Sequence, residues 1–383
     1  MKQILAVIAV LLLGLFTTSC GRDPTAPIEG VNGTSTDPAS ALDRVPKLHV
    51  SGSVTVFASG FNAPSGLTFG PDGYLYVAEA GCGGTSLMGP EANAVKSPIG
   101  PYTGGMTARI SKVSLAGVRS TVVEGLPSSQ SSRQNGCRFR GVADVEFVGS
   151  TLYALVCGAG PSHGFAGIPN SIVRVDGMFN WKVVADLSQH LDMHPIAKPD
   201  PYDIEPDGIW HSMAKVQDRL IAVEPNHGEL DEIDPMTGEV RRIVDISSTQ
   251  GHIDPSAVVY RAGYFYVGNL TTPPEVDGRA AIYRISPTGE VVQWAAGFTD
   301  INGLAFDERG RLYVLEGRTS QGGTIVRINL GGWRETIVTG LSLPTAFAFG
   351  PDRALYVANR GYGQGMVGCG EILRITGESI NPF

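Results

Sequence analysis

The stretch PSGLTFGPDGYLYVAEAG at residues 64–81 is the clearest repeated unit of this chain. It returns 280 residues later as PTAFAFGPDRALYVANRG at 344–361, with ten of the eighteen positions identical. Gly-Pro-Asp forms a tight turn in each copy, because proline restricts φ and aspartate can hydrogen-bond the nearby backbone. Leu-Tyr-Val-Ala is an apolar run of β-formers, which is typical of a strand buried on both faces. Each copy therefore predicts a β-hairpin.

Four weaker copies of this hairpin lie between the two, at residues 143–156, 212–224, 256–269 and 302–316. The residues that open the second strands are numbers 75, 152, 220, 265, 312 and 355, so the spacings are 77, 68, 45, 47 and 43. A repeat of about 40–50 residues with four strands per unit is typical of a propeller blade. Six hairpins thus predict six blades.

A third strand follows every hairpin, but only five fourth strands follow the third ones. The sixth third strand is EILRIT at 371–376, and its partner is predicted to be SVTVFASG at 53–60, which precedes the first hairpin. This pairing would remove the exposed edge of an open array. We therefore predict an all-β, six-bladed propeller over residues 48–383. Each blade would have four antiparallel strands, and strand 53–60 would close the ring by pairing into the last blade.

The first twenty residues have the pattern of an export signal. Lys2 precedes an apolar run from Ile4 to Phe16, which is shorter than the roughly 20 residues that span a bilayer. The next residues, Thr-Thr-Ser-Cys, end at Cys20 and resemble a bacterial lipobox, in which the cysteine is lipidated. Residues 1–20 are thus predicted to be a lipoprotein signal peptide, with ordinary signal cleavage as the alternative.

Residues 21–47 are rich in Pro, Thr, Ser, Gly and Asp and show no periodicity. This composition predicts a flexible tether, and a coil of this length reaches roughly 30 Å. We expect the tether to hold a folded head near a membrane in the cell envelope, outside the cytoplasm. In a cell with two membranes, the anchor would lie in the outer membrane or on the periplasmic side.

The charge of the chain gives no evidence for a nucleic-acid partner. The formal net charge is −8, and no long basic run occurs in the 383 residues. Nucleic-acid binding normally leaves a basic patch. We therefore expect no nucleic acid among the partners.

The long irregular segments all fall on one face of the predicted disc, which we call the top face. Connections from fourth to first strands and from second to third strands leave on this face. They include 80–108, 126–142, 157–170, 188–211, 247–255 and 270–280. Since function on a rigid scaffold usually lies in such loops, the top face is the predicted site of ligand binding.

Polar residues end most of the second strands at the top face. We expect this strand-end set to surround the mouth of the central channel; its members are Glu79, Glu224, Asn269, Glu316 and Asn359. Three carboxylates and two amides are oxygen ligands that suit Ca²⁺ or another divalent cation. The alternative is that these side chains bind loop amides or channel water.

The innermost strands place mostly small residues at their top ends: Ser65, Ala143, Ser212, Ser256, Asn302 and Thr345. The segment INGLAF at 301–306 resembles the Asn-Gly-Leu segment of the SMP-30/gluconolactonase propellers. That resemblance implies that Asn302 is a metal ligand. The aspartates that the family carries on other inner strands are replaced by small residues here, so only Asn302 is carried over.

Six of the seven histidines lie in or beside the top loops of the second to fourth blades: His163, His190, His194, His211, His227 and His252. His190 and His194 are four residues apart, which places two imidazoles on one face of a helical turn. A transition-metal site or an acid–base pair is one interpretation. The other is that these are ordinary loop side chains.

Four cysteines follow Cys20, and all of them map to the top face. Four cysteines allow three pairings, and export favours disulfides. We predict the pairs Cys137–Cys157 and Cys82–Cys369, because each pair lies beside neighbouring strands or blades of the closed ring.

Residues 67–84, 104–129 and 142–156 resemble the ScyD/ScyE family of exported six-bladed propellers, which have NHL-like and SMP-30-like blades. The resemblance extends over most of residues 53–376. It implies the propeller fold, export and a link to secondary metabolism, and it transfers no catalytic residue.

Two classes of function follow from these observations. The first is a membrane-anchored binding or scaffold propeller whose top face holds a small molecule, a glycan or a protein loop. The second is a metal-dependent lactonase of SMP-30 type, with a cation at the channel mouth that polarises a carbonyl and activates water. The scarcity of acids on the inner strands favours the binding module, since fold alone does not confer activity.

Overall fold

The computed structural model describes residues 48–50, 52–84, 95–271, 276–362, 367–377 and 380. Residues 37–383 form one compact unit, and every strand of the structure lies within it. The predicted signal peptide, Cys20 and the tether over 21–47 lie outside the described residues. Among the described residues, no helix is long and apolar enough to cross a membrane.

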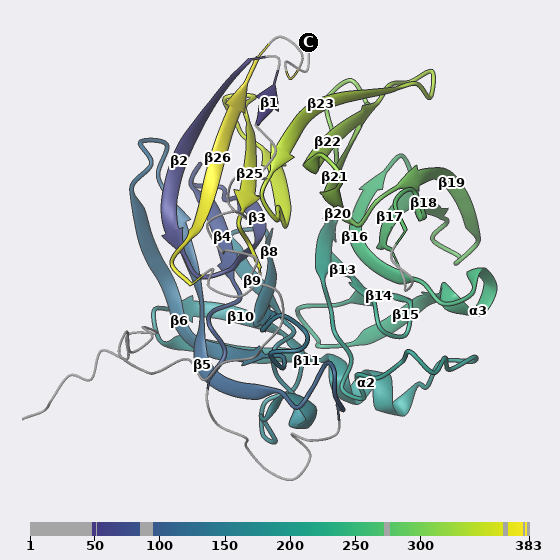
Figure 1. Cartoon of the computed structure of the whole chain (residues 1–383). Helices are drawn as coiled ribbons and strands as arrows, with labels where there is room; N and C mark the ends of the chain where they lie inside the picture. Colours follow the sequence, from purple (N-terminus) through teal and green to yellow (C-terminus); the bar gives the residue numbers. More distant parts are fainter. Residues whose placement is uncertain are drawn as a thin grey trace, which may run out of the picture. The chain divides into compact units, whose positions relative to one another are not determined.

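The structure is a six-bladed β-propeller, as predicted (Figure 1). The first three blades are built from the following strands. Blade 1 has β3 (Pro64–Phe69), β4 (Leu75–Glu79), β5 (Thr103–Val113), β6 (Arg119–Gln130) and the short β7 (Phe139–Arg140). Blade 2 has β8 (Val142–Val148), β9 (Thr151–Val156), β10 (Ser171–Gly177) and β11 (Asn180–Asp186). Blade 3 has β12 (Ser212–Val216), β13 (Arg219–Glu224), β14 (Glu229–Ile233) and β15 (Val240–Asp245).

The other three blades complete the ring. Blade 4 has β16 (Asp254–Arg261), β17 (Tyr264–Leu270), β18 (Ala280–Ile285) and β19 (Val291–Phe298). Blade 5 has β20 (Ile301–Phe306), β21 (Leu312–Thr319), β22 (Gly322–Ile328) and β23 (Arg334–Leu341), with β1 (His49–Val50) at its outer edge. Blade 6 has β24 (Ala346–Phe349), β25 (Leu355–Asn359), β26 (Gly370–Thr376) and β2 (Ser53–Phe61).

The N-terminal strand closes the ring as predicted. β2 pairs antiparallel with β26, in a register that runs from Ser53 opposite Thr376 to Phe61 opposite Gly370. Figure 1 shows β2 beside β26, although they come from opposite ends of the sequence. The outer edge of β26 is therefore paired instead of exposed.

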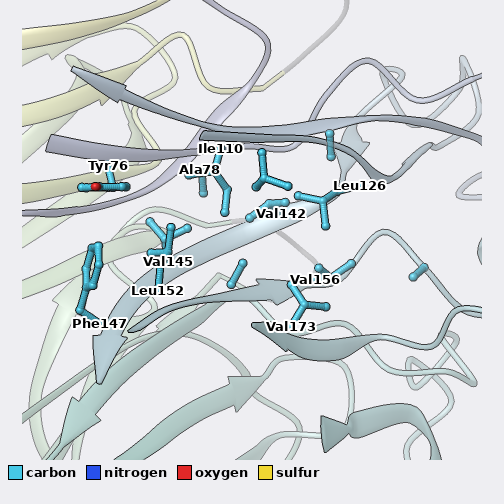
Figure 2. Close-up of a cluster of buried hydrophobic side chains, with 14 residues drawn as sticks. Tyr76, Ala78, Ile110, Leu126, Val142, Val145, Phe147, Leu152, Val156 and Val173 are labelled. Atoms are coloured by element: carbon cyan, nitrogen blue, oxygen red, sulfur yellow. The ribbon is translucent and has the colours of Figure 1, made fainter. Parts of the chain in front are cut away.

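Apolar side chains fill each junction between neighbouring blades. Figure 2 shows the junction of blades 1 and 2, where Tyr76 and Ile110 face Phe147, Leu152 and Val173. The rings of Tyr76 and Phe147 meet edge to face, with centroids 4.9 Å apart. Equivalent clusters lie at the other five junctions. The second strands are buried on both faces, as their apolar runs predict.

Part of the sequence that we expected to be loop is instead strand. β5 and β6 extend toward the top face into a long hairpin, in which Thr103 pairs with Gln130. The glycines of these segments made the strand extension hard to predict from the sequence. In the structure they allow neighbouring backbones to come close together. A β-carbon on Gly84 would lie only 2.0 Å from the carbonyl oxygen of Gly104. Short helices occur at η2 (Pro161–His163), α2 (Leu187–Met193) and α3 (Ser247–Gln250).

Candidate functional site

A cavity of about 170 Å³ lies where the top ends of the innermost strands meet. Every blade contributes to its lining. All six residues that the sequence placed at the top of the inner strands line it: Ser65, Ala143, Ser212, Ser256, Asn302 and Thr345. The cavity is thus the top of the central channel.

Most of these inner-strand residues link one blade to the next. Each donates a side-chain hydrogen bond to a backbone carbonyl of the following inner-strand segment. The bonds are Ser65 to Val142 (2.6 Å), Asn302 to Pro344 (2.7 Å), Thr345 to Pro64 (2.6 Å) and Ser256 to Ile301. This belt explains why small polar residues stand where the SMP-30 resemblance led us to look for acids.

At blade 2, where Ala143 has no polar side chain, Asp144 makes the hydrogen bonds to the next blade. Its Oδ2 accepts hydrogen bonds from Met213 N (2.9 Å) and Ser212 Oγ (3.3 Å), so it joins blade 2 to blade 3. Burial raises the pKa of the Asp144 carboxyl to about 7. A β-carbon on Gly66 would lie 2.3 Å from Asp144 Oδ1, so glycine at this position leaves room for the carboxylate.

Basic side chains form one part of the cavity lining. Arg138, Arg140 and Arg318 contribute guanidinium groups, and His211 contributes an imidazole. The acids of the lining are Asp144 and Asp300. Asp300 accepts a 2.6 Å bond from Arg318. The lining therefore brings together three arginines, one histidine and two aspartates, and the Asp144 carboxyl is half protonated near pH 7.

A buried polar network lies beside Arg140. The hydroxyl of Tyr102 donates to Glu205 Oε1 over 2.7 Å. His163 Nε2 lies 3.6 Å from the other oxygen of Glu205. Burial raises the pKa of Glu205 to about 7, so the negative charge beside Arg140 is only partly present at neutral pH. Burial and Arg140 lower the pKa of His163 to about 3, which keeps this imidazole neutral.

The strand-end set lies outside the lining of this cavity. Second strands stand one strand spacing, about 4.8 Å, farther from the axis than first strands, and their side chains meet the loops. Four members accept a backbone N–H from the segment that enters the same blade. The bonds run from Asn62 to Glu79 (2.7 Å), Ile209 to Glu224 (2.7 Å), Thr299 to Glu316 (2.8 Å) and Ser342 to Asn359 (2.8 Å). Asn269 instead accepts from Ala281 N over 2.8 Å.

The same side chains make further internal contacts. Glu79 is ion-paired with Arg109 at 2.8 Å and Arg119 at 3.5 Å. Glu224 also accepts from the backbone N–H groups of Asn226 and His227. A divalent cation would have to displace these donors. Among the described residues, no group of three His, Cys, Asp or Glu side chains is arranged to hold a metal ion. The carboxylates that we expected to bind Ca²⁺ are therefore already engaged by protein donors in this arrangement, and the cation site stays a prediction.

The six top-loop histidines are distributed over several environments, and of these only His211 lines the cavity. The rings of His190, in α2, and His194, which caps its C-terminal end, stack with centroids 4.4 Å apart, as their spacing predicts for a helical turn. His227 lies 3.1 Å from Glu224. His252 lies between Asp203 (3.4 Å) and Asp254 (3.2 Å).

Neither predicted disulfide is formed among the described residues. Cys137 and Cys157 are buried thiols, and Cys369 is an exposed one. Cys137 lies in the turn before β7 on the sheet of blade 1, whereas Cys157 packs with Trp210 and Leu187 between blades 2 and 3. Cys82 packs beside Ala80 and Phe139.

Arg138, Arg140 and Asp144 were missed in the sequence, and Glu205 was noted only as an acid near the His190 and His194 pair. Arg138 and Arg140 lie in the predicted loop 126–142, and Glu205 lies in 188–211; neither segment has a periodicity that places side chains. Asp144 did carry a signal, since it directly follows the inner-strand position of Ala143.

Comparison with solved structures supports the fold. A protein of unknown function from Bacteroides thetaiotaomicron has a TM-score of 0.54 at 12% identity, over 86% of this chain and 77% of that chain. A putative oxidoreductase (glucose dehydrogenase) from a Thermus species has a TM-score of 0.51 at 19% identity, and the match covers 85% of this chain and 99% of that one. A gluconolactonase of Xanthomonas campestris has a TM-score of 0.51 at 10% identity, and the match covers 89% of this chain and 94% of that one.

These likenesses show a shared propeller fold and assign no activity, because all the identities are below 20%. No protein-family model and no curated protein sequence matches the chain. The fold and the cavity define the class: a six-bladed β-propeller with an arginine-lined cavity at one end of its channel. The particular resemblance to the ScyD/ScyE family stays a prediction.

Proposed function

We propose that this protein is an exported, lipid-anchored binding propeller whose top cavity holds a small anionic ligand, a carboxylate in the simplest case. The observation that carries the proposal is the gathering of three arginines, Arg138, Arg140 and Arg318, in the lining of one cavity. The acids of the lining are Asp144 and Asp300, and burial raises the pKa of the Asp144 carboxyl to about 7. Guanidinium groups bind planar carboxylates through paired hydrogen bonds.

The size of the cavity limits the ligand. A cavity of about 150 Å³ holds benzene, so about 170 Å³ suits a ligand of roughly six to ten non-hydrogen atoms. Phe139 and Tyr362 line the cavity together with the arginines. A compact carboxylic acid with an apolar or ring-shaped body matches both features.

The alternative, a metal-dependent lactonase, receives less support from the site. Its candidate ligands use their oxygens for loop N–H groups and arginines. Asn302, the residue carried over from the SMP-30 resemblance, does line the cavity, but its Nδ2 donates to Pro344 O over 2.7 Å. The gluconolactonase of similar fold is too distant in sequence to transfer its activity.

Calorimetric titration with benzoate and with the neutral isostere benzamide tests the binding proposal. We expect benzoate to bind more tightly. Arg138→Gln should weaken benzoate binding about tenfold, since a hydrogen bond to a charged group contributes about 1.5–3 kcal/mol. Arg133→Gln is the matched control, because Arg133 is exposed in the same segment and outside the cavity lining. Equal binding of the two compounds would overturn the proposal, and Ca²⁺-dependent hydrolysis of a lactone would favour the alternative.

The anchoring proposal is supported by the sequence alone and needs its own test. The full chain should partition into detergent, and Cys20→Ala should abolish that partition. A soluble parent chain would contradict lipidation at Cys20.

A further inference from the structure

Each nitrogen of the His252 imidazole faces a carboxylate. His252 Nδ1 lies 3.4 Å from Asp203 Oδ1, and His252 Nε2 lies 3.2 Å from Asp254 Oδ1. The three side chains come from different parts of the chain. Asp203 belongs to segment 188–211, His252 lies in the connection between blades 3 and 4, and Asp254 begins β16. His252 therefore joins a long top loop to blade 4.

The protonated form of this imidazole is the one that fits both contacts. A neutral imidazole carries one N–H, so its other nitrogen would point a lone pair at a carboxylate oxygen. His252 Nδ1 and Asp203 Oδ1 are buried, and among the described residues neither has a hydrogen-bond partner. Asp203 Oδ2, in contrast, accepts from Asp200 N over 2.6 Å. The positive charge of His252 is therefore what compensates the buried Asp203 Oδ1.

The groups around His252 favour its charge. The contact with Asp254 raises the pKa of His252 above its usual 6.5; partial burial opposes this, and the charges of Asp254, Asp203 and Asp200 add to the rise. Burial raises the pKa of the Asp203 carboxyl, so this carboxylate is costly to ionise without a cationic neighbour.

Two further groups border this cluster. The ring of Tyr202 lies 5.7 Å from the His252 ring, centroid to centroid. His227 acts on Asp203 and is itself 3.1 Å from Glu224. Burial lowers the pKa of His227, but Glu224 and Asp203 outweigh it, so that pKa is also raised. Any test of His252 must therefore separate it from His227.

The segment that carries Asp203 is also anchored on blade 3 and reaches the top cavity. Asn226, in the turn between β13 and β14, donates to Tyr202 O over 2.9 Å and accepts from Glu205 N over 2.6 Å. The Glu205 carboxylate accepts from Tyr102 in the network beside Arg140. Loosening of residues 200–205 would therefore reach the network at the cavity wall.

We propose that His252 is a pH-sensitive latch, which holds residues 200–205 against blade 4 while its imidazole is protonated. When the proton leaves, the neutral ring donates to one carboxylate at most, and residues 200–205 open more often. The closed form gains from the protonated histidine at low pH, and this gain is lost as pH rises through the pKa of His252. The inference does not depend on the ligand proposed for the top cavity.

Histidine NMR of the full chain tests the protonation. The chain has seven histidines, and His252→Gln assigns the His252 signal. We expect the His252 pKa to lie above 6.5 in the parent and to fall in Asp254→Asn. His49→Gln, at an exposed position of β1, should leave the His252 titration unchanged. A His252 pKa at or below 6.5 in the parent would overturn the proposal.

Hydrogen exchange of residues 200–205, corrected for the intrinsic effect of pH on exchange, tests the opening. Protection in the parent should fall between pH 6 and pH 8. The full fall is about tenfold for each unit by which closure raises the His252 pKa, because opening and deprotonation are linked. His252→Gln should be as weakly protected at pH 6 as the parent is after the proton has left.

His227→Gln is the matched control, because His227 is the neighbouring histidine and its contact with Glu224 stays within blade 3. It should keep the pH dependence of the parent, and circular dichroism checks that both variants are folded. Loss of the pH dependence in His227→Gln but not in His252→Gln would refute the latch. Equal protection of the parent at both pH values would refute it too.

Discussion

Arg140 Nη1 donates a hydrogen bond to His211 Nε2 over 2.9 Å, joining β7 of blade 1 to the entry of blade 3. Burial and the neighbouring Arg140 and Arg138 lower the pKa of His211 to about 3, so its ring is neutral and Nε2 can accept. Arg140 also lines the top cavity, so this bond helps to orient its guanidinium there. A positioned guanidinium is what anion recognition requires.

The first prediction concerns Glu205→Gln and pH. Burial raises the pKa of Glu205 from 4.5 to about 7 in the folded protein. The folded state thus keeps a proton that the unfolded state releases, and this glutamate makes the protein less stable as pH rises from about 4.5 to 7. Glutamine resembles the protonated form. The stability gain of the variant over the parent should therefore grow by on the order of 2–3 kcal/mol between pH 5 and pH 8.

Urea unfolding at the two pH values measures that difference. Glu239→Gln, at an exposed turn position, controls for the loss of a charge and should show a small, constant difference. A Glu205→Gln gain that is the same at both pH values would show that the glutamate is ionised throughout.

The second prediction separates a structural from a metal-binding role for Glu316. This carboxylate accepts from Thr299 N (2.8 Å) and Thr324 Oγ1 (2.7 Å). Glu316→Ala leaves two buried donors without acceptors and should cost about 2–5 kcal/mol of unfolding free energy. Glu316→Gln keeps an acceptor for Thr299 and should cost less than about 1 kcal/mol.

Thermal unfolding with EDTA or with added Ca²⁺ should give the same midpoint for parent and Gln variant. A midpoint of the parent that rises with Ca²⁺, and no longer does so in the Gln variant, would restore the cation site.

The third prediction tests closure of the ring by two truncations. β2 forms seven residue pairs with β26, whereas β1 forms two with β23. A chain that begins at Gly52 should fold like the parent. A chain that begins at Asn62 loses β2, exposes the edge of β26 and uncovers the core beside Phe57 and Tyr356. Size-exclusion chromatography should find the longer chain monomeric and the shorter one aggregated. Equal behaviour of the two would mean that β2 contributes little to stability.

The fourth prediction concerns the cysteines. Cys369 is exposed, whereas Cys137 and Cys157 are buried, and burial raises the pKa of the Cys157 thiol. Maleimide should label Cys369 in the native protein and should reach Cys137 and Cys157 only after unfolding. Mass spectrometry of the labelled peptides assigns the sites. A Cys137–Cys157 peptide recovered without reduction would instead support the disulfide that the sequence analysis predicted.

Periodic features of the chain could be predicted because they repeat. The hairpin at 64–81 and its five copies give the blade number, and the position of SVTVFASG before the first hairpin predicts the closure that β2 and β26 confirm. Strand order alone also placed Ser65, Asn302 and Thr345 at one end of the channel. Each of these predictions depends on local alternation and connectivity, which the sequence carries directly.

The strand-end set shows where such reasoning stops. Glu79 and Glu224 end β4 and β13 as predicted, whereas β21 continues past Glu316 to Thr319. The partners of these three side chains are loop amides and, for Glu79, arginines that no periodicity locates. The six top-loop histidines show the same limit. Among them, only the stacking of His190 on His194 could be predicted from their spacing in the sequence.

Sequence periodicity was therefore sufficient to establish a closed six-bladed ring and the ends of its strands, since both follow from the repeat length and the polar–apolar pattern. The arginine-lined cavity depends on packing between blades. Arg140 belongs to segment 126–142, whereas Glu205 and His211 belong to segment 188–211, and the two segments meet only after the blades have closed around the channel. Burial in the folded protein raises the pKa of the Glu205 and Asp144 carboxyls to about 7, which residue type alone would not do. The protonation of these groups then sets the charge in and beside the cavity.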